Sequence, residues 1–250
     1  MATEYYRVAD AETRVVSVVH SLLLVLAAFV VGSLALSVVG SLFRAAGLQV
    51  EPIAALPPLP YAALTATQFV GFFLVIGFYV AVNGGREYFS IGVPSLRDLG
   101  MVVVGFVGLF AVSTVFTVLL GALDIDTATN QVITQGQQDP VRFLYLVPVT
   151  FLFVAPAEEL LFRGLVQGLF RRAYGVVPAI LLASVLFGAP HYLALLGSDG
   201  SVGPKLVIIT VLGVVLGTLY ELTDNLAVPI LVHGLWNSFS FLSQYLAATG

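Results

Sequence analysis

Long apolar segments alternate with short polar ones along almost the whole chain. The apolar segments cover seven stretches, at about residues 15–43, 61–82, 99–123, 143–170, 176–196, 206–222 and 226–248. A helix of about 20 apolar residues is long enough to cross the hydrocarbon core of a bilayer. The pattern therefore predicts an all-α fold, a polytopic membrane helix bundle of about seven transmembrane helices around an intramembrane polar cavity.

The connections between these segments are short except for one. Residues 124–140 form the longest polar stretch, and a surface helix near residues 127–138 would supply an eighth helix. Proline and glycine clusters mark several of the other turns, as the Pro57-Pro58-Leu59-Pro60 sequence does. We expect a single integral membrane domain over residues 1–250.

Three ionisable residues interrupt the fourth apolar segment. Glu158, Glu159 and Arg163 lie inside residues 143–170, where each charge costs roughly 2.5–3.5 kcal/mol near a bilayer centre. Glu159 and Arg163 are four apart and can pair on one helix face, whereas Glu158 points elsewhere with no basic residue within a turn. Glu158 is therefore available to exchange a proton with water. The alternative is that all three charges only hold helices together.

Further polar residues lie in the fifth and seventh apolar segments. His191 follows a proline in the fifth, and His233 and Asn237 share one helix face in the seventh. Taken singly, each could be a satisfied interhelical hydrogen-bonding group. Together with Glu158, they predict one polar site in which a glutamate and a histidine polarise water. A second histidine and an asparagine would donate hydrogen bonds to an oxyanion.

Composition narrows the protein class. Hydrophobic residues make up 59% of the chain, mean hydropathy is +1.02, and charged residues make up 10%, against about 25% in soluble domains. The absence of cysteine excludes disulfides and thiolate catalysis. The net charge of −4 and the single lysine, Lys205, exclude a polybasic nucleic-acid surface. The partners expected from the sequence are the bilayer and a substrate, with no nucleic acid.

Other hydrolytic sites do not fit the sequence. No histidine begins a His-Glu-x-x-His motif, no apolar segment contains a Gly-x-Ser-x-Gly elbow, and no aspartate lies within an apolar run. Zinc remains an alternative with Glu158, His191 and His233 as ligands. Each histidine stands alone on its own helix, however, and the i+4 partner of His233 is asparagine. We therefore expect no metal or other cofactor.

Three motifs, in order, resemble those of the CAAX prenyl protease and bacteriocin-processing family (CPBP, also called Abi). They are Glu-Glu-x-x-x-Arg at 158–163, Phe-x-x-x-His at 187–191 and His-x-x-x-Asn at 233–237, in a core of about residues 143–248. The resemblance implies an intramembrane endopeptidase acting on a membrane-associated protein or peptide, prenylated or not. It implies that Glu158 and His191 activate water, that His233 and Asn237 hold the oxyanion, and that Glu159 and Arg163 support the site. Relatives resemble eight-helix bundles.

Two other function classes stay open. A non-catalytic scaffold or immunity factor would keep the polar cluster for folding. A proton-coupled transporter would use Glu158 and the histidines as a relay, but the halves of the chain show no internal repeat of the kind that transporters carry.

The distribution of basic residues predicts the orientation of the chain. With seven spans, one side holds six arginines, Arg7, Arg14, Arg86, Arg97, Arg171 and Arg172. The other side holds Arg44, Arg142 and Lys205. We expect a multi-pass protein of the cell membrane with a cytoplasmic N-terminus. In the sixth segment, Gly213 and Gly217 are expected to serve helix packing, and Glu221 to be solvated.

Overall fold

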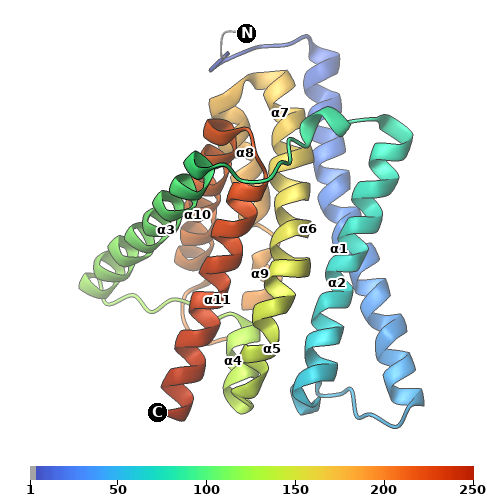
Figure 1. Cartoon of the computed structure of the whole chain (residues 1–250), viewed down its shortest axis with the longest axis vertical. Helices are drawn as coiled ribbons and strands as arrows, with labels where there is room; N and C mark the ends of the chain where they lie inside the picture. The colour runs from blue at the N-terminus through green and yellow to red at the C-terminus, as the bar shows by residue number, and fades with distance from the viewer. Residues whose placement is uncertain (1–3) are drawn as a thin grey trace.

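The computed structural model describes residues 4–250, and its regular elements are all helices (Figure 1). The α-helices are α1 (Ala11–Ala45), α2 (Pro58–Asn83), α3 (Leu96–Ala122), α4 (Gln131–Gln138), α5 (Val141–Val149), α6 (Ala155–Glu159), α7 (Gln167–Tyr174), α8 (Val176–Gly188), α9 (His191–Leu195), α10 (Val202–Thr223) and α11 (Ala227–Thr249). The predicted all-α membrane bundle is confirmed.

Six helical stretches are long and apolar enough to cross a membrane, so the chain is a multi-pass membrane protein. They are α1, α2, α3, Val141–Tyr174, Val176–Leu195 and α10. The seventh predicted span corresponds to α11, which has 23 residues and carries several polar side chains. Figure 1 shows the first turns of α1 and the last turns of α11 at opposite ends of the bundle, as an odd number of passes requires. The helix expected within residues 127–138 is α4, whose eight residues are too few to span.

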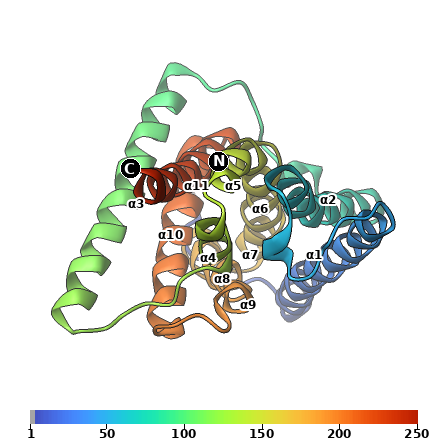
Figure 2. The ribbon, with the colours of Figure 1, turned by 90° about the horizontal axis from the view of Figure 1, so that it is seen from below.

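The helices form two flanks around a central group (Figure 2). On one flank α1 packs against α2, and on the other α3 packs against α10 and α11. The α1–α2 contact is very close, because a Cβ atom on Gly71 would lie 2.5 Å from Cα of Gly32. Glycine at both positions therefore lets the two backbones meet. Between the flanks run α5, α6 and α7, end to end.

The central helix, which contains Pro148 and Pro156, alternates between α-helical and π-helical segments. Two π-helical segments, η3 (Thr150–Val154) and η4 (Leu160–Val166), lie on either side of α6. Pro156 has no backbone N–H to donate within the helix, and we attribute the wider turn before it to this missing hydrogen bond. The helix widens at Pro156 without breaking. Glu158 and Glu159 consequently lie on a short α-helical turn between two π-helical ones.

The fifth predicted span is not one continuous helix. The stretch Val176–Leu195 is long and apolar enough to cross a membrane, as predicted, but within it α8 ends at Gly188 and α9 begins at His191. Pro190 lies in the break, and it can neither donate a backbone hydrogen bond nor fit the preceding turn without a clash. The break brings His191 into the first turn of a new helix, close to the bundle interior.

Candidate active site

The four residues expected to carry the chemistry line one cavity. Glu158 comes from α6, His191 from α9, and His233 and Asn237 from α11. The cavity has a volume of about 330 Å³. The side chains of Glu158 and His233 are 10% and 8% exposed, so both are close to fully buried at the inner end of the cavity. Residues up to 79 positions apart in the sequence thus meet at membrane depth.

Glu159 and Arg163 form the ion pair that their spacing predicted. Arg163 Nη1 lies 3.0 Å from Glu159 Oε1, and the two side chains are 1% and 0% exposed. Arg163 Nη2 also donates to the carbonyl of Gly213 at 3.2 Å, and the guanidinium lies 4.3 Å above the ring centre of Phe187. A buried charge is tolerated when it is paired and hydrogen-bonded in this way.

His233 contacts both glutamates. Its Nδ1 atom lies 2.7 Å from Glu159 Oε1, and its Nε2 atom lies 3.6 Å from Glu158 Oε2. A carboxylate only accepts hydrogen bonds, so the short contact assigns a proton to Nδ1 and turns Nε2 toward Glu158. The expectation that Glu158 has no nearby basic group holds for its own helix, but α11 supplies one across the bundle.

His191 is oriented by a backbone carbonyl. Its Nδ1 atom lies 2.9 Å from the oxygen of Phe187, at the break between α8 and α9. Since the carbonyl can only accept, Nδ1 carries the proton and Nε2 of the neutral ring is free to accept one. Within residues 4–250 no hydrogen bond joins His191 to Glu158 directly, although both line the cavity.

Asn237 is held by a residue that the sequence reasoning missed. Its Nδ2 atom donates to Oγ1 of Thr150 at 3.1 Å, and Thr150 is fully buried in η3. The amide has a second N–H that this bond does not use. Thr150 is one of the few polar residues inside the apolar run of residues 143–170. Its position there was the signal in the sequence that could have identified it.

The first half of the chain also contributes to the cavity, although it carries no motif. Polar residues of the first half that line the cavity are Thr65 and Gln68 on α2. Asn130, Lys205 and Ser240 line it from the second half, and none of the five was anticipated from the sequence. The residues of α2 that line the cavity lie in its N-terminal half, which is nearest to α4. The residues of α11 that line the cavity extend from the middle of that helix toward its C-terminus. The cavity therefore extends from Glu158 toward the α4 end of the bundle.

A metal site needs several His, Asp or Glu side chains around one point. Within the part of the chain that the structure describes, no group of three or more His, Asp or Glu side chains is arranged to hold a metal ion. His233 contacts the carboxylates of both Glu158 and Glu159. One oxygen of Glu159 already contacts both Arg163 and His233.

A comparison with known families finds a match for part of the second half of the chain. The family model for type II CAAX prenyl endopeptidase Rce1-like proteins matches residues 140–239. This range contains Glu158, His191, His233 and Asn237. No curated protein and no solved structure gives a significant match.

Proposed function

We propose that this protein is an intramembrane endopeptidase, because residues 140–239 match the family model for type II CAAX prenyl endopeptidase Rce1-like proteins. It would hydrolyse a peptide bond in a membrane-associated protein or peptide. The resemblance seen in the sequence and the family match agree on this class of hydrolase.

The convergence of four side chains on one cavity supports the proposal most directly. Glu158, His191, His233 and Asn237 come from three helices, and nothing in their spacing along the chain requires them to meet. A polar cluster kept only for folding would be expected to bury its groups against each other. Here they border a cavity of about 330 Å³, which is the size of a small ligand site.

In the proposed reaction, Glu158 acts as the general base. It takes a proton from a water molecule as the oxygen attacks the carbonyl carbon of the scissile bond. His191 accepts the second hydrogen bond of this water at Nε2, because its Nδ1 proton is committed to the carbonyl of Phe187. Two acceptors on one water molecule orient its lone pair toward the substrate.

The tetrahedral oxyanion then needs hydrogen-bond donors. His233 would donate from Nε2 and Asn237 from its free amide N–H. His233 donates at Nε2 only when both ring nitrogens are protonated, and the Glu159 carboxylate at Nδ1 stabilises that cation. Collapse of the intermediate breaks the C–N bond as Glu158 returns its proton to the leaving amine.

A cleavage assay with two fluorogenic probe peptides tests the proposal. One ends in a farnesylated CAAX sequence and the other is identical without the prenyl group. We expect purified protein to cleave at least the farnesylated probe, and Glu158→Gln to lower the rate by about 100-fold or more. Glu51→Gln changes an exposed glutamate in the α1–α2 connection and is the matched control. Equal rates in Glu158→Gln and the unmodified protein would favour a non-catalytic role.

A further inference from the structure

Polar contacts continue from the candidate active site along two facing helices. Polar side chains recur every four residues on the central helix, at Glu159, Arg163, Gln167 and Arg171. The facing helix α10 offers acceptors at the same spacing, at Gly213, Gly217 and Glu221. We name these seven residues the polar ladder. Each of its contacts is a hydrogen bond or an ion pair between helices or within one turn.

Gln167 is the centre of the polar ladder. Its Nε2 atom donates to the carbonyl of Gly217 at 3.2 Å and to Oε1 of Glu221 at 2.9 Å. Both partners only accept, so they fix the orientation of the amide. Gln167 is 1% exposed, and an amide buried so deeply is costly without such partners. These two bonds hold α7 in register with α10.

The two glycines of α10 make this register specific. A Cβ atom on Gly217 would lie 2.7 Å from Oε1 of Gln167, and one on Gly213 would lie 3.2 Å from both Phe187 and Ser184. Arg163 and Gln167 therefore reach the backbone carbonyls of Gly213 and Gly217. Each carbonyl oxygen can also accept the hydrogen bond of its own helix, because it has two lone pairs. Gly213 and Gly217 were expected to serve helix packing, and their lack of side chains also exposes these two carbonyl acceptors.

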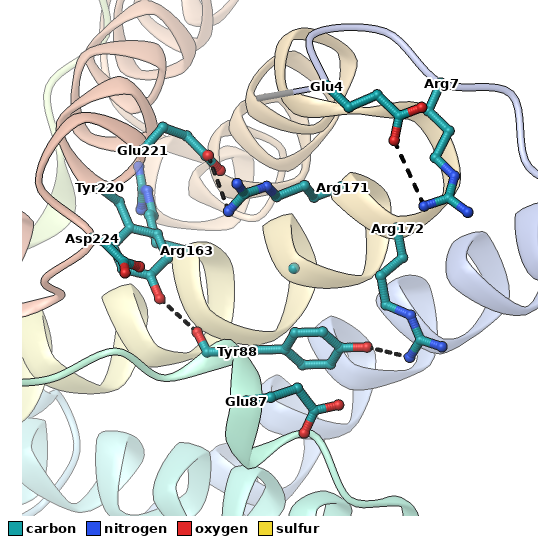
Figure 3. A pocket seen from close by; sticks show the side chains of 11 residues that line it. Glu4, Arg7, Glu87, Tyr88, Arg163, Arg171, Arg172, Tyr220, Glu221 and Asp224 are labelled. Atoms are coloured by element: carbon teal, nitrogen blue, oxygen red, sulfur yellow. Dashed lines mark hydrogen bonds and ion pairs between the residues drawn. The ribbon is translucent and has the colours of Figure 1, made fainter. Parts of the chain in front are cut away.

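The ladder ends at a polar pocket on the N-terminal end of the bundle. Arg163, Arg171 and Glu221 all line this pocket, which has a volume of about 430 Å³ (Figure 3). Figure 3 shows the contact between Arg171 and Glu221, whose closest atoms are 3.2 Å apart. The side chain of Glu221 is only 9% exposed, so the expectation that it is solvated is wrong.

From these contacts we propose that Gln167 and Glu221 are positioning residues for His233, acting through Arg163 and Glu159. The bonds of Gln167 to α10 keep the carbonyl of Gly213 within reach of Arg163. Arg163, held there, presents its other nitrogen to Glu159, whose Oε1 bonds His233 Nδ1. Neither residue touches the cavity, so neither is a catalytic residue. This inference rests on the proposed peptidase function.

The polar ladder and the walls of the cavity lie in different parts of the bundle. The cavity walls lie on the α4 side of Glu158, whereas the polar ladder runs to the opposite end of the bundle. Removing hydrogen bonds from the polar ladder should therefore shift His233 and leave the residues on the α4 side of the cavity in place. Misplacement of a catalytic group by a distant change lowers kcat by roughly 10- to 100-fold.

The experiment compares four variants with the farnesylated probe. Gln167→Leu removes both interhelical bonds, and Glu221→Leu removes the acceptor at the end of the ladder. Glu221→Gln keeps an oxygen acceptor for Gln167 and is the conservative variant. Thr218→Val is the control, because Thr218 lies on α10 and its hydroxyl donates only to its own helix at Val214. Thermal unfolding is measured for each variant.

We expect Gln167→Leu and Glu221→Leu to lower kcat by roughly 10-fold or more with KM nearly unchanged. Glu221→Gln should recover most of kcat, and Thr218→Val should match the unmodified protein. Full kcat in both leucine variants, or equal losses of kcat in Glu221→Gln and Glu221→Leu, would overturn the proposal. If Gln167→Leu does not fold, the two Glu221 variants decide. An inactive unmodified protein would contradict the proposed function instead.

Discussion

Nδ1 of His233 lies 2.7 Å from Oε1 of Glu159, although 74 positions separate the two residues in the chain. The same oxygen accepts from Arg163 at 3.0 Å. One carboxylate oxygen thus joins a cation of its own helix to a histidine of α11. This relationship explains why the site holds two adjacent glutamates. Glu159 orients His233, which leaves Glu158 facing the cavity.

Removing Arg163 should destabilise the protein strongly. Arg163→Ala leaves Glu159 buried without its cation, a loss of about 3–5 kcal/mol for a buried pair. Arg44→Ala is the matched control, because Arg44 pairs with Glu51 in an exposed position, where such pairs contribute about 1 kcal/mol or less. Thermal unfolding and yield in detergent measure both variants. Equal unfolding temperatures would show that the buried pair contributes no more than the exposed one.

Asn237 and Thr150 should differ in their effects on turnover. Asn237→Ala removes a proposed oxyanion donor and should lower kcat by about 100- to 1000-fold. Thr150→Val removes only the acceptor that holds the amide, so the donor remains and kcat should fall by about 10-fold or less. Steady-state kinetics with the farnesylated probe compares the two. A larger loss in Thr150→Val than in Asn237→Ala would remove Asn237 from the proposed oxyanion site.

The orientation of the chain can be tested because it contains no cysteine. Glu87 lies in the α2–α3 connection and Glu51 in the α1–α2 connection. Figure 1 shows these two connections at opposite ends of the bundle, with α4 at the same end as the α1–α2 connection. The two variants are Glu87→Cys and Glu51→Cys. With a cytoplasmic N-terminus, an impermeant maleimide added to intact cells should label Cys at position 51 and not at position 87. The reverse pattern would place the N-terminus outside.

The same orientation determines which side the cavity faces. The cavity extends from Glu158 toward the α4 end of the bundle, so a cytoplasmic N-terminus makes it face outward. We expect intact cells to cleave a membrane-impermeant version of the unprenylated probe, if the prenyl group proves dispensable in the purified assay. Cells expressing Glu158→Gln are the control. Cleavage that requires cell lysis would show that the cavity faces the cytoplasm.

Activity should survive exhaustive chelation. Binding Glu158, His191 and His233 to zinc would remove the base and an oxyanion donor, and His233 Nδ1 is already bonded to Glu159. We therefore expect full activity after dialysis against a chelator, with no stoichiometric metal by elemental analysis. One zinc ion per chain, with activity lost on chelation and restored by zinc, would instead make these three residues ligands.

Some features followed from the sequence alone. Apolar runs of about 20 residues predicted membrane helices, because no other single segment satisfies its backbone hydrogen bonds in lipid. Glu159 and Arg163 are four apart on one helix, so their pairing followed from helix geometry. Three motifs in order predicted the family that the comparison with residues 140–239 supports.

Only the tertiary structure decided which helices meet. Lipid tails and protein interiors are both apolar, so the sequence of a spanning helix does not mark which face packs against which neighbour. Three features depend on that packing. They are the hydrogen bond of Gln167 to Glu221, the hydrogen bond of Asn237 to Thr150, and the position of Gln68 on the cavity wall. The sequence determined the depth and the local partners of each polar group. The packing of α10 and α11 on the central helix determined what each group contacts.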